Sequence, residues 1–301
     1  MLKKAISILI TLAFIISIVP SNTAQALTTK TPEQVKNYAI YYGPSDTEKI
    51  NQLKKFDLVV IDPDNFTAEQ VQAIKESGTI VLGYQDTLAV NKANPQLPGL
   101  QSGDYMTVNG KRVETTSGST VQSFLDPRSA HLWEILKKEI NTRIYNKGLD
   151  GVFLEGINYS EFLGEYVTLD ANALRNLQLD LYAGTKNMLN QIKAMNSAKY
   201  VAQNNGWREL KSHTGQYIDF LFWSGYQDDL GNSNEWLNNR RDEVLSLKNQ
   251  YGVVPLANKA ISPENTAGME QFYSTVKSQG LIPYAVPGAY TDINTFNLPN
   301  T

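Results

Sequence analysis

The 301-residue chain contains no cysteine and only two histidines, His131 and His213. The absence of cysteine excludes a disulfide framework, a zinc–cysteine site, an iron–sulfur cluster and a cysteine nucleophile. Both histidines fall in or beside expected helices and lack the paired spacing of metal ligands or of a Ser-His-Asp triad. The sequence therefore predicts no metal site and no cofactor.

Basic charge is also scarce, because 27 Lys and Arg stand against 30 Asp and Glu and the formal net charge is −3. This balance argues against a duplex nucleic-acid partner. Lys3 and Lys4 precede an apolar run over 5–20 and then Ala24-Gln25-Ala26, the pattern of a secretory signal peptide. No later run approaches about 18 consecutive apolar residues. We therefore expect a signal peptide over 1–26, with an uncleaved anchor as the alternative, and a secreted, extracellular mature protein without a membrane segment.

The mature chain, 27–301, reads as one domain. Short apolar runs alternate with amphipathic stretches, and the expected strands are 38–42, 57–61, 79–84, 151–155, 200–204, 218–223, 252–258 and 281–286. Eight such units predict an α/β fold, a single (β/α)8 TIM barrel. An open doubly wound sheet is the alternative, but Tyr42-Gly43-Pro44-Ser45 is no glycine-rich phosphate loop. Residues 86–122 interrupt the alternation of strands and helices and form an inserted loop after the third strand. Within this loop we expect a hairpin at Asn109-Gly110.

Carboxylates follow several of the expected strands, and the carboxyl ends of the strands are where such barrels hold their sites. The catalytic candidates are Glu155, Asp62 and Asp126. Glu155 ends a Val-Phe-Leu run, where a buried carboxylate needs a partner or a function. Asp62 precedes Pro63 and Asp126 precedes Pro127, so each also fits an ordinary turn or helix cap.

Amide, hydroxyl and aromatic side chains occupy the same strand ends. The candidate substrate-binding residues are Tyr42, Tyr84, Asn204, Asn205, Ser224, Tyr226 and Asp228, with Asp64, Asp86, Asn258 and Tyr290 on the same rim and Trp207 and Trp223 as further stacking surfaces. Carboxylates for acid–base chemistry, amides for hydroxyl groups and aromatic faces for sugar rings suit a polysaccharide or oligosaccharide. The shortage of Lys and Arg on this rim favours a cationic amino-sugar polymer.

Several segments carry a resemblance to a known family. They are Tyr41-Tyr42-Gly43, the stretch 56–63 ending in Asp62-Pro63, Gly83-Tyr84, Asp126-Pro127-Arg128 with Trp133, the stretch 148–156, and Asn204-Asn205-Gly206. From about residue 36 to 290 the chain resembles glycoside hydrolase family 114. The resemblance implies a (β/α)8 barrel and the activity of an endo-α-1,4-polygalactosaminidase.

The chain departs from the family pattern at three places. Glu155 stands where the family usually has Asp, Gln85-Asp86-Thr87 replaces a Gly-Glu pair, and Ser224 ends the sixth strand where the family has Glu. Glycoside hydrolysis ordinarily requires two carboxylates, and serine cannot replace one.

Two hypotheses follow, besides a barrel with an unrelated ligand. In the first, the protein is a glycosidase in which Glu155 is the proton donor and Asp62, Asp126 or Asp228 is the nucleophile or base. In the second, the barrel has lost hydrolysis and binds cell-surface or matrix polysaccharide.

Overall fold

The computed structural model describes residues 30–93, 95, 97–117, 119–226, 234–288, 290–296 and 298. The expected signal peptide and Asp228 lie outside these described residues. None of the helices in this part of the chain combines the length and apolarity needed to span a bilayer.

Eight parallel strands form one sheet in the order in which they follow along the chain. They are β1 (Tyr38–Tyr41), β2 (Leu58–Ile61), β3 (Ile80–Asp86), β9 (Gly151–Glu155), β10 (Tyr200–Asn204), β11 (Phe220–Ser224), β12 (Val254–Ala260) and β13 (Ile282–Val286). The last strand lies beside the first, and just beyond β1 the Tyr42 N–H donates to the Tyr290 carbonyl at 2.7 Å. The sheet is thus a nearly closed barrel, which confirms the predicted fold class.

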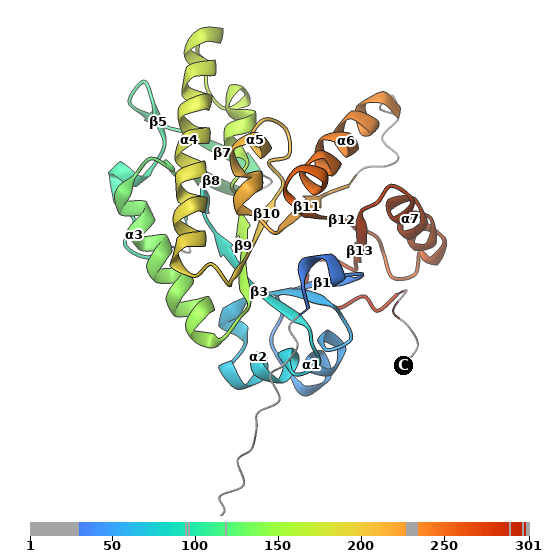
Figure 1. Cartoon of the computed structure of the whole chain (residues 1–301). Coiled ribbons are helices and arrows are strands. Elements are labelled where there is room, and N and C mark those ends of the chain that lie inside the picture. Colours follow the sequence, from blue (N-terminus) through green and yellow to red (C-terminus); the bar gives the residue numbers. More distant parts are fainter. Residues whose placement is uncertain are drawn as a thin grey trace, which may run out of the picture.

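Helices surround the barrel (Figure 1). They are α1 (Thr47–Leu53), α2 (Ala68–Lys75), α3 (Ala130–Glu139), α4 (Ala171–Met195), α5 (Lys211–Thr214), α6 (Asn234–Tyr251) and α7 (Thr266–Ser278). Local signals set their ends: Thr67 forms a capping box with Gln70 at the start of α2, and the Asp170 side chain accepts two N–H groups at the start of α4. A π-helical turn, η4 (Ile140–Ile144), and a 3₁₀ turn, η5 (Tyr145–Lys147), extend α3 to Gly148, whose φ is +83°.

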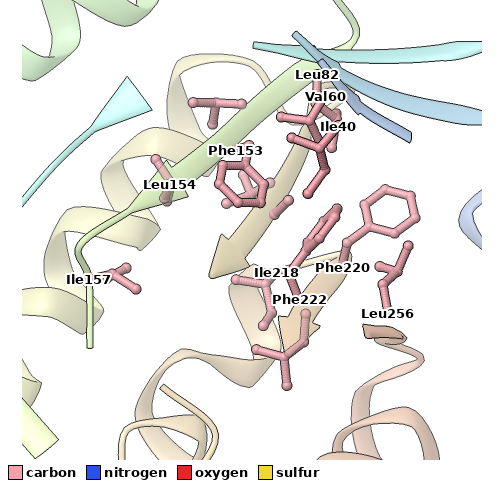
Figure 2. Packing of buried hydrophobic residues seen from close by; sticks show 14 of the residues in the cluster. Ile40, Val60, Leu82, Phe153, Leu154, Ile157, Ile218, Phe220, Phe222 and Leu256 are labelled. Carbon is pink, nitrogen blue, oxygen red and sulfur yellow. The ribbon is translucent and has the colours of Figure 1, made fainter. Parts of the chain in front are cut away.

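The barrel interior is filled by apolar side chains from successive strands (Figure 2). The Phe153 and Phe222 ring centroids lie 4.8 Å apart, and Tyr38 meets Phe222 edge-on at 5.3 Å. Since side chains alternate along a strand, the residue two positions later points the same way. Glu155 therefore lies directly beyond Phe153, and Ser224 directly beyond Phe222. The core forms an apolar floor beneath a polar layer at the barrel mouth.

The insertion after β3 builds its own small sheets. The antiparallel strands β4 (Ala89–Asn91), β8 (Thr120–Phe124) and β7 (Glu114–Ser117) form one, and β5 (Thr107–Val108) with β6 (Lys111–Arg112) forms the expected hairpin. Asn109 and Gly110 have φ of +50° and +75°, and positive φ at both central residues is what the type I′ turn favoured by Asn-Gly requires. The three-stranded sheet was not predicted; it stands beside the carboxyl ends of β3 and β9.

Candidate active site

A chain of hydrogen bonds crosses the ends of four neighbouring strands, β9 to β12. Asn204 Nδ2 donates to Glu155 Oε2 at 2.8 Å, and the Ser224 hydroxyl donates to Asn204 Oδ1 at 2.6 Å. Asn258 Nδ2 donates to Ser224 Oγ at 3.1 Å. We call Glu155, Asn204, Ser224 and Asn258 the polar chain. Its members all point inward, beyond the apolar floor.

Glu155 is the acidic end of the polar chain. The Gly156 N–H donates to its Oε1 at 3.0 Å, so both carboxylate oxygens accept a hydrogen bond. Burial raises the pKa of the Glu155 carboxyl, the bonds from Asn204 and Gly156 oppose that rise, and the charge of Asp86 adds to it. Gly156 has φ of +74°, and a Cβ there would lie 2.9 Å from the Ala89 side chain, so the turn requires glycine.

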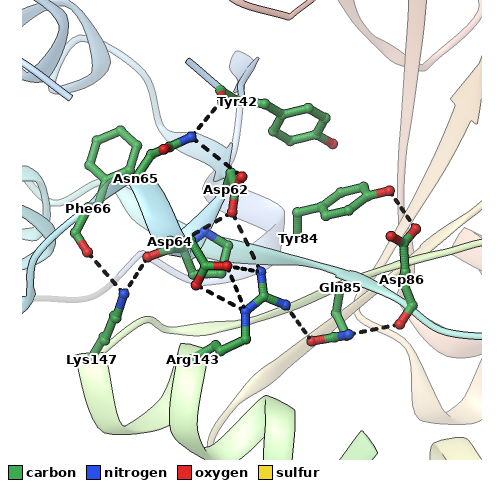
Figure 3. A network of polar contacts seen from close by, with 11 residues as sticks. Tyr42, Asp62, Asp64, Asn65, Phe66, Tyr84, Gln85, Asp86, Arg143 and Lys147 are labelled. Carbon is green, nitrogen blue, oxygen red and sulfur yellow. Dashed lines mark hydrogen bonds and ion pairs between the residues drawn. The ribbon is translucent and has the colours of Figure 1, made fainter. Parts of the chain in front are cut away.

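Asp86 stands next to Glu155 on the neighbouring strand. The two residues are direct partners in the parallel pairing of β3 with β9. The Tyr84 hydroxyl donates to Asp86 Oδ1 at 2.7 Å (Figure 3). Burial raises the pKa of the Asp86 carboxyl, although the Tyr84 hydrogen bond and the charge of Arg143 act in the opposite direction.

Asp86 and Glu155 share one cavity of about 340 Å³. It is lined by Tyr84, Asp86, Ala89, Thr115, Gln122, Phe124, Glu155, Gly156, Asn158, Tyr159, Phe162 and Tyr166. The inserted sheet supplies one wall, and the loop after β9 supplies another. Among these lining residues the charged side chains are Asp86 and Glu155, with no Lys or Arg.

Tyrosines lie beside the carboxylates. The ring centroid of Tyr42 is 4.8 Å from that of Tyr84 and 5.2 Å from that of Tyr290. Tyr84 stacks on Phe153 at 6.1 Å, which joins this aromatic group to the apolar floor. Burial, followed by the charge of Glu155, raises the pKa of the Tyr42 and Tyr290 hydroxyls, so both are held as neutral phenols.

Asp62 and Asp126, the other two catalytic candidates, do not line this cavity. Asp62 accepts the Asp64 N–H at 3.1 Å and lies 3.6 Å from Arg143 Nη2 (Figure 3). Asp126 accepts the Arg128 backbone N–H at 2.9 Å and pairs with its guanidinium at 2.7 Å. Asp62 thus caps the short turn η2 (Pro63–Asn65), as its alternative interpretation predicted, whereas the N-cap of α3 is Ser129 and not Asp126. Asp126 instead pairs with Arg128.

The remaining binding candidates divide into two groups. The first group lies around Glu155 and comprises Asn204, Ser224, Tyr42 and Tyr84. The second group lies away from it. Asn205, for example, is a turn residue with φ of +55° whose side chain accepts the Ser224 N–H at 3.1 Å. Tyr226 is only 1% exposed; it packs against Trp223 and Phe272, and its hydroxyl bonds Gln279. Trp207 and Trp223 are also buried, with ring centroids 5.3 Å apart, and they belong to the core.

Asp86 is the functional candidate that the sequence placed on the rim but left out of the catalytic set. The sequence shows Asp86 as an acidic residue two positions after Tyr84, at the end of an expected strand. Its place beside Glu155 depends on the register between the two strands, which the sequence does not show. Within the described residues no group of three or more His, Asp or Glu is placed to hold a metal ion.

A nearly closed barrel with an acidic, aromatic-lined cavity at the carboxyl ends of its strands suits glycoside hydrolysis. The family model of glycoside-hydrolase family GH114 matches residues 19–226, and the chain belongs to this family. A comparison with curated proteins finds no match.

Solved structures share the fold at low sequence identity. The glycoside hydrolase domain of PelA from Pseudomonas aeruginosa is 15% identical, with 86% of this chain and 97% of that chain covered and a TM-score of 0.68. Ega3 of Aspergillus fumigatus, in complex with galactosamine, is 14% identical over 85% of this chain and 93% of that one, with a TM-score of 0.60. The α-galactosidase TtGalA from Thermus thermophilus is 12% identical over 88% and 64%, with a TM-score of 0.56.

Proposed function

We propose that the protein is a secreted glycoside hydrolase that cleaves an extracellular amino-sugar polysaccharide within the chain, as an endo-α-1,4-polygalactosaminidase does. In this proposal residues 1–26 direct export and are then removed, which leaves 27–301 as the acting domain. The observation that carries the proposal is the cavity around Glu155, whose charged side chains are all acidic. Membership of family GH114 and the likeness to Ega3, which was solved with galactosamine, support it.

The lining of the cavity suits a sugar that bears a positive charge. The Glu155 carboxylate attracts an ammonium group, and no basic side chain of the lining repels it. Thr115, Gln122 and Asn158 offer hydrogen bonds to hydroxyl groups, and the Phe124 and Tyr159 rings, stacked at 4.5 Å, form part of an apolar wall. The volume of about 340 Å³ is within the range of small-ligand sites.

The alternative function is polysaccharide binding without hydrolysis, and one observation favours it. Ser224 stands at the end of the sixth strand, where the family pattern has Glu, and its hydroxyl is engaged within the polar chain. On this view Glu155 and its neighbours bind sugar hydroxyls and amines but break no bond.

Incubation of residues 27–301 with partly deacetylated galactosaminan tests the proposal, with new reducing ends and polymer binding as the readouts. We expect release by the wild type and none by Glu155→Gln. Glu76→Gln is the matched control, because Glu76 is an exposed carboxylate at the end of α2. Binding without release in the wild type and in Glu155→Gln supports the alternative, and absence of both binding and release contradicts both functions.

A further inference from the structure

The proposed hydrolysis needs a second carboxylate besides Glu155. The candidate carboxylates differ in whether they already pair with an arginine and in whether they line the cavity. Asp62 and Asp126 lie against Arg143 and Arg128 and do not line the cavity. Ser224 has no ionisable group. Among the described residues, Asp86 is the carboxylate that shares the cavity with Glu155.

Strand register brings Asp86 and Glu155 together. They are direct partners on β3 and β9, and neighbouring strands of a sheet lie about 4.8 Å apart. The same pairing sets Tyr84 beside Phe153 two residues earlier on each strand, where the two rings stack. Both carboxylates therefore point to the same side, beyond that aromatic pair and into the cavity.

We infer that Asp86 is the second catalytic carboxylate and the proton donor, and that Glu155 is the nucleophile. This inference rests on the proposed function. It differs from the sequence-based hypothesis in both the identity of the aspartate and the division of roles.

The direction of the hydrogen bonds separates the two roles. The Ser224 hydroxyl donates to Asn204 Oδ1, which leaves Asn204 Nδ2 to donate to Glu155. With the Gly156 N–H on its other oxygen, Glu155 accepts at both oxygens, an arrangement that stabilises the ionised form. Asp86 accepts only the Tyr84 hydroxyl among the described residues, at Oδ1, so Oδ2 is available to carry a proton. Burial and the negative charge of Asp62 raise the pKa of the Asp86 carboxyl, against the Tyr84 hydrogen bond and the charge of Arg143, and so favour keeping that proton.

The reaction then proceeds in two displacements. Glu155 forms a bond to the anomeric carbon while the glycosidic C–O bond breaks, and Asp86 transfers its proton to the leaving oxygen. A water molecule next gives a proton to Asp86 and attacks the anomeric carbon, which breaks the ester bond to Glu155 and restores both carboxyl groups. Two displacements retain the anomeric configuration, and the strand spacing suits the separation of about 5–5.5 Å between carboxyl groups that retention requires.

The test compares Asp86→Asn with the wild type on two substrates. One is partly deacetylated galactosaminan, and the other is a galactosamine oligomer joined to 2,4-dinitrophenol, a leaving group that needs no proton. We expect Asp86→Asn to lose about 10²–10⁴-fold in rate on the polymer and much less in the formation of the glycosyl-enzyme from the aryl substrate. Glu155→Gln loses both reactions. Circular dichroism and thermal unfolding verify that each variant is folded.

The results distinguish a failure of the Asp86 assignment from a failure of the proposed function. If the wild type releases reducing ends and folded Asp86→Asn does so at the same rate, the role of Asp86 is overturned while the proposed function stands. If Asp86→Asn does not fold, the wild-type product decides: retention by proton NMR supports the assignment and inversion overturns it. A wild type that releases no reducing ends overturns both.

Discussion

At the scale of single residues, the site depends on the change from an apolar to a polar side chain between successive inward-facing positions of a strand. Phe153 is 1% exposed, and Glu155, two residues later, is a carboxylate that points the same way. The apolar layer beneath Glu155 excludes water, and loss of water raises the pKa of its carboxyl. The polar chain compensates by supplying hydrogen bonds in place of water.

A half-buried carboxylate outside the proposed site, Glu161, allows a further test of burial. It accepts the Leu210 N–H at 2.9 Å, and burial raises its pKa to about 7. Because the folded protein holds this proton more tightly than the unfolded chain, stability falls as the pH rises from about 4.5 to about 7. Glu161→Gln removes this dependence. We therefore expect the unfolding free energy of the variant, measured relative to the wild type, to be higher at pH 8 than at pH 4.5 by up to about 3 kcal/mol.

Urea denaturation of the wild type and of Glu161→Gln at the two pH values measures this gain. Glu165→Gln is the control, because Glu165 is exposed on the same 3₁₀ segment, η6 (Tyr159–Glu165). A difference between Glu161→Gln and wild type that is the same at both pH values would falsify the prediction.

At the scale of elements, the π-helical turn η4 connects the helical layer to the barrel mouth. It carries Arg143, whose Nη2 pairs with Asp64 at 2.8 Å and whose Nη1 donates to Gln85 Oε1 at 3.1 Å (Figure 3). Gln85 is fully buried, and its Nε2 donates to the Asp86 carbonyl at 2.8 Å. Arg143 thus holds the end of β3 on which Asp86 stands.

Arg143→Gln is expected to destabilise the protein by about 1–3 kcal/mol, because it leaves the buried Gln85 side chain without its charged donor. The matched control is Lys137→Gln on α3, which breaks only the exposed pair with Glu134 at 2.6 Å. We expect that control to cost less than about 0.5 kcal/mol. Urea unfolding of both variants measures the contrast, and equal losses would contradict the role of Arg143.

At the scale of the whole molecule, charge acts on the choice of substrate. The chain has a net charge of −3, which becomes −5 if residues 1–26 are removed, since they contain two lysines and no acid. The acidic cavity concentrates part of that charge where a glycan would bind. Binding of a polycation should therefore depend on ionic strength.

We expect the affinity for partly deacetylated galactosaminan to fall as salt rises from about 0.05 to 0.5 M, because exposed charges are screened over shorter distances. Calorimetry with Asp86→Asn, which keeps the Glu155 carboxylate and is expected to cleave the polymer about 10²–10⁴-fold more slowly, measures binding with little turnover. The fully N-acetylated polymer is the control ligand and should bind weakly at every salt concentration. Equal, salt-independent affinity for both polymers counts against the electrostatic selection.

Local sequence signals predicted much of the barrel correctly. Asn109-Gly110 turns the hairpin as expected, and the helix ends likewise follow local residues, since Thr67 caps α2 and Gly148 ends the helical segment after α3. These signals are reliable because the interactions that produce them lie within a few residues of one another.

The aromatic rim was harder to predict. Tyr42 and Tyr84 lie beside Glu155, but Tyr226 is buried against Trp223 and against Phe272 on α7. A tyrosine that follows a strand can point into the barrel mouth or into the layer between sheet and helices. Which of these occurs depends on the backbone turn after the strand and on the helix packed beside it.

The sequence by itself determined the family, the eight strands and the place of Glu155 at the end of one of them. Only the tertiary structure decided which aspartate accompanies Glu155, because that depends on the register between β3 and β9 and on the arginines that engage Asp62 and Asp126. Asp86 and Glu155 are 69 positions apart in the chain and become neighbours only when the sheet forms. Register is set by the packing of whole strands, and no local pattern around either carboxylate records it.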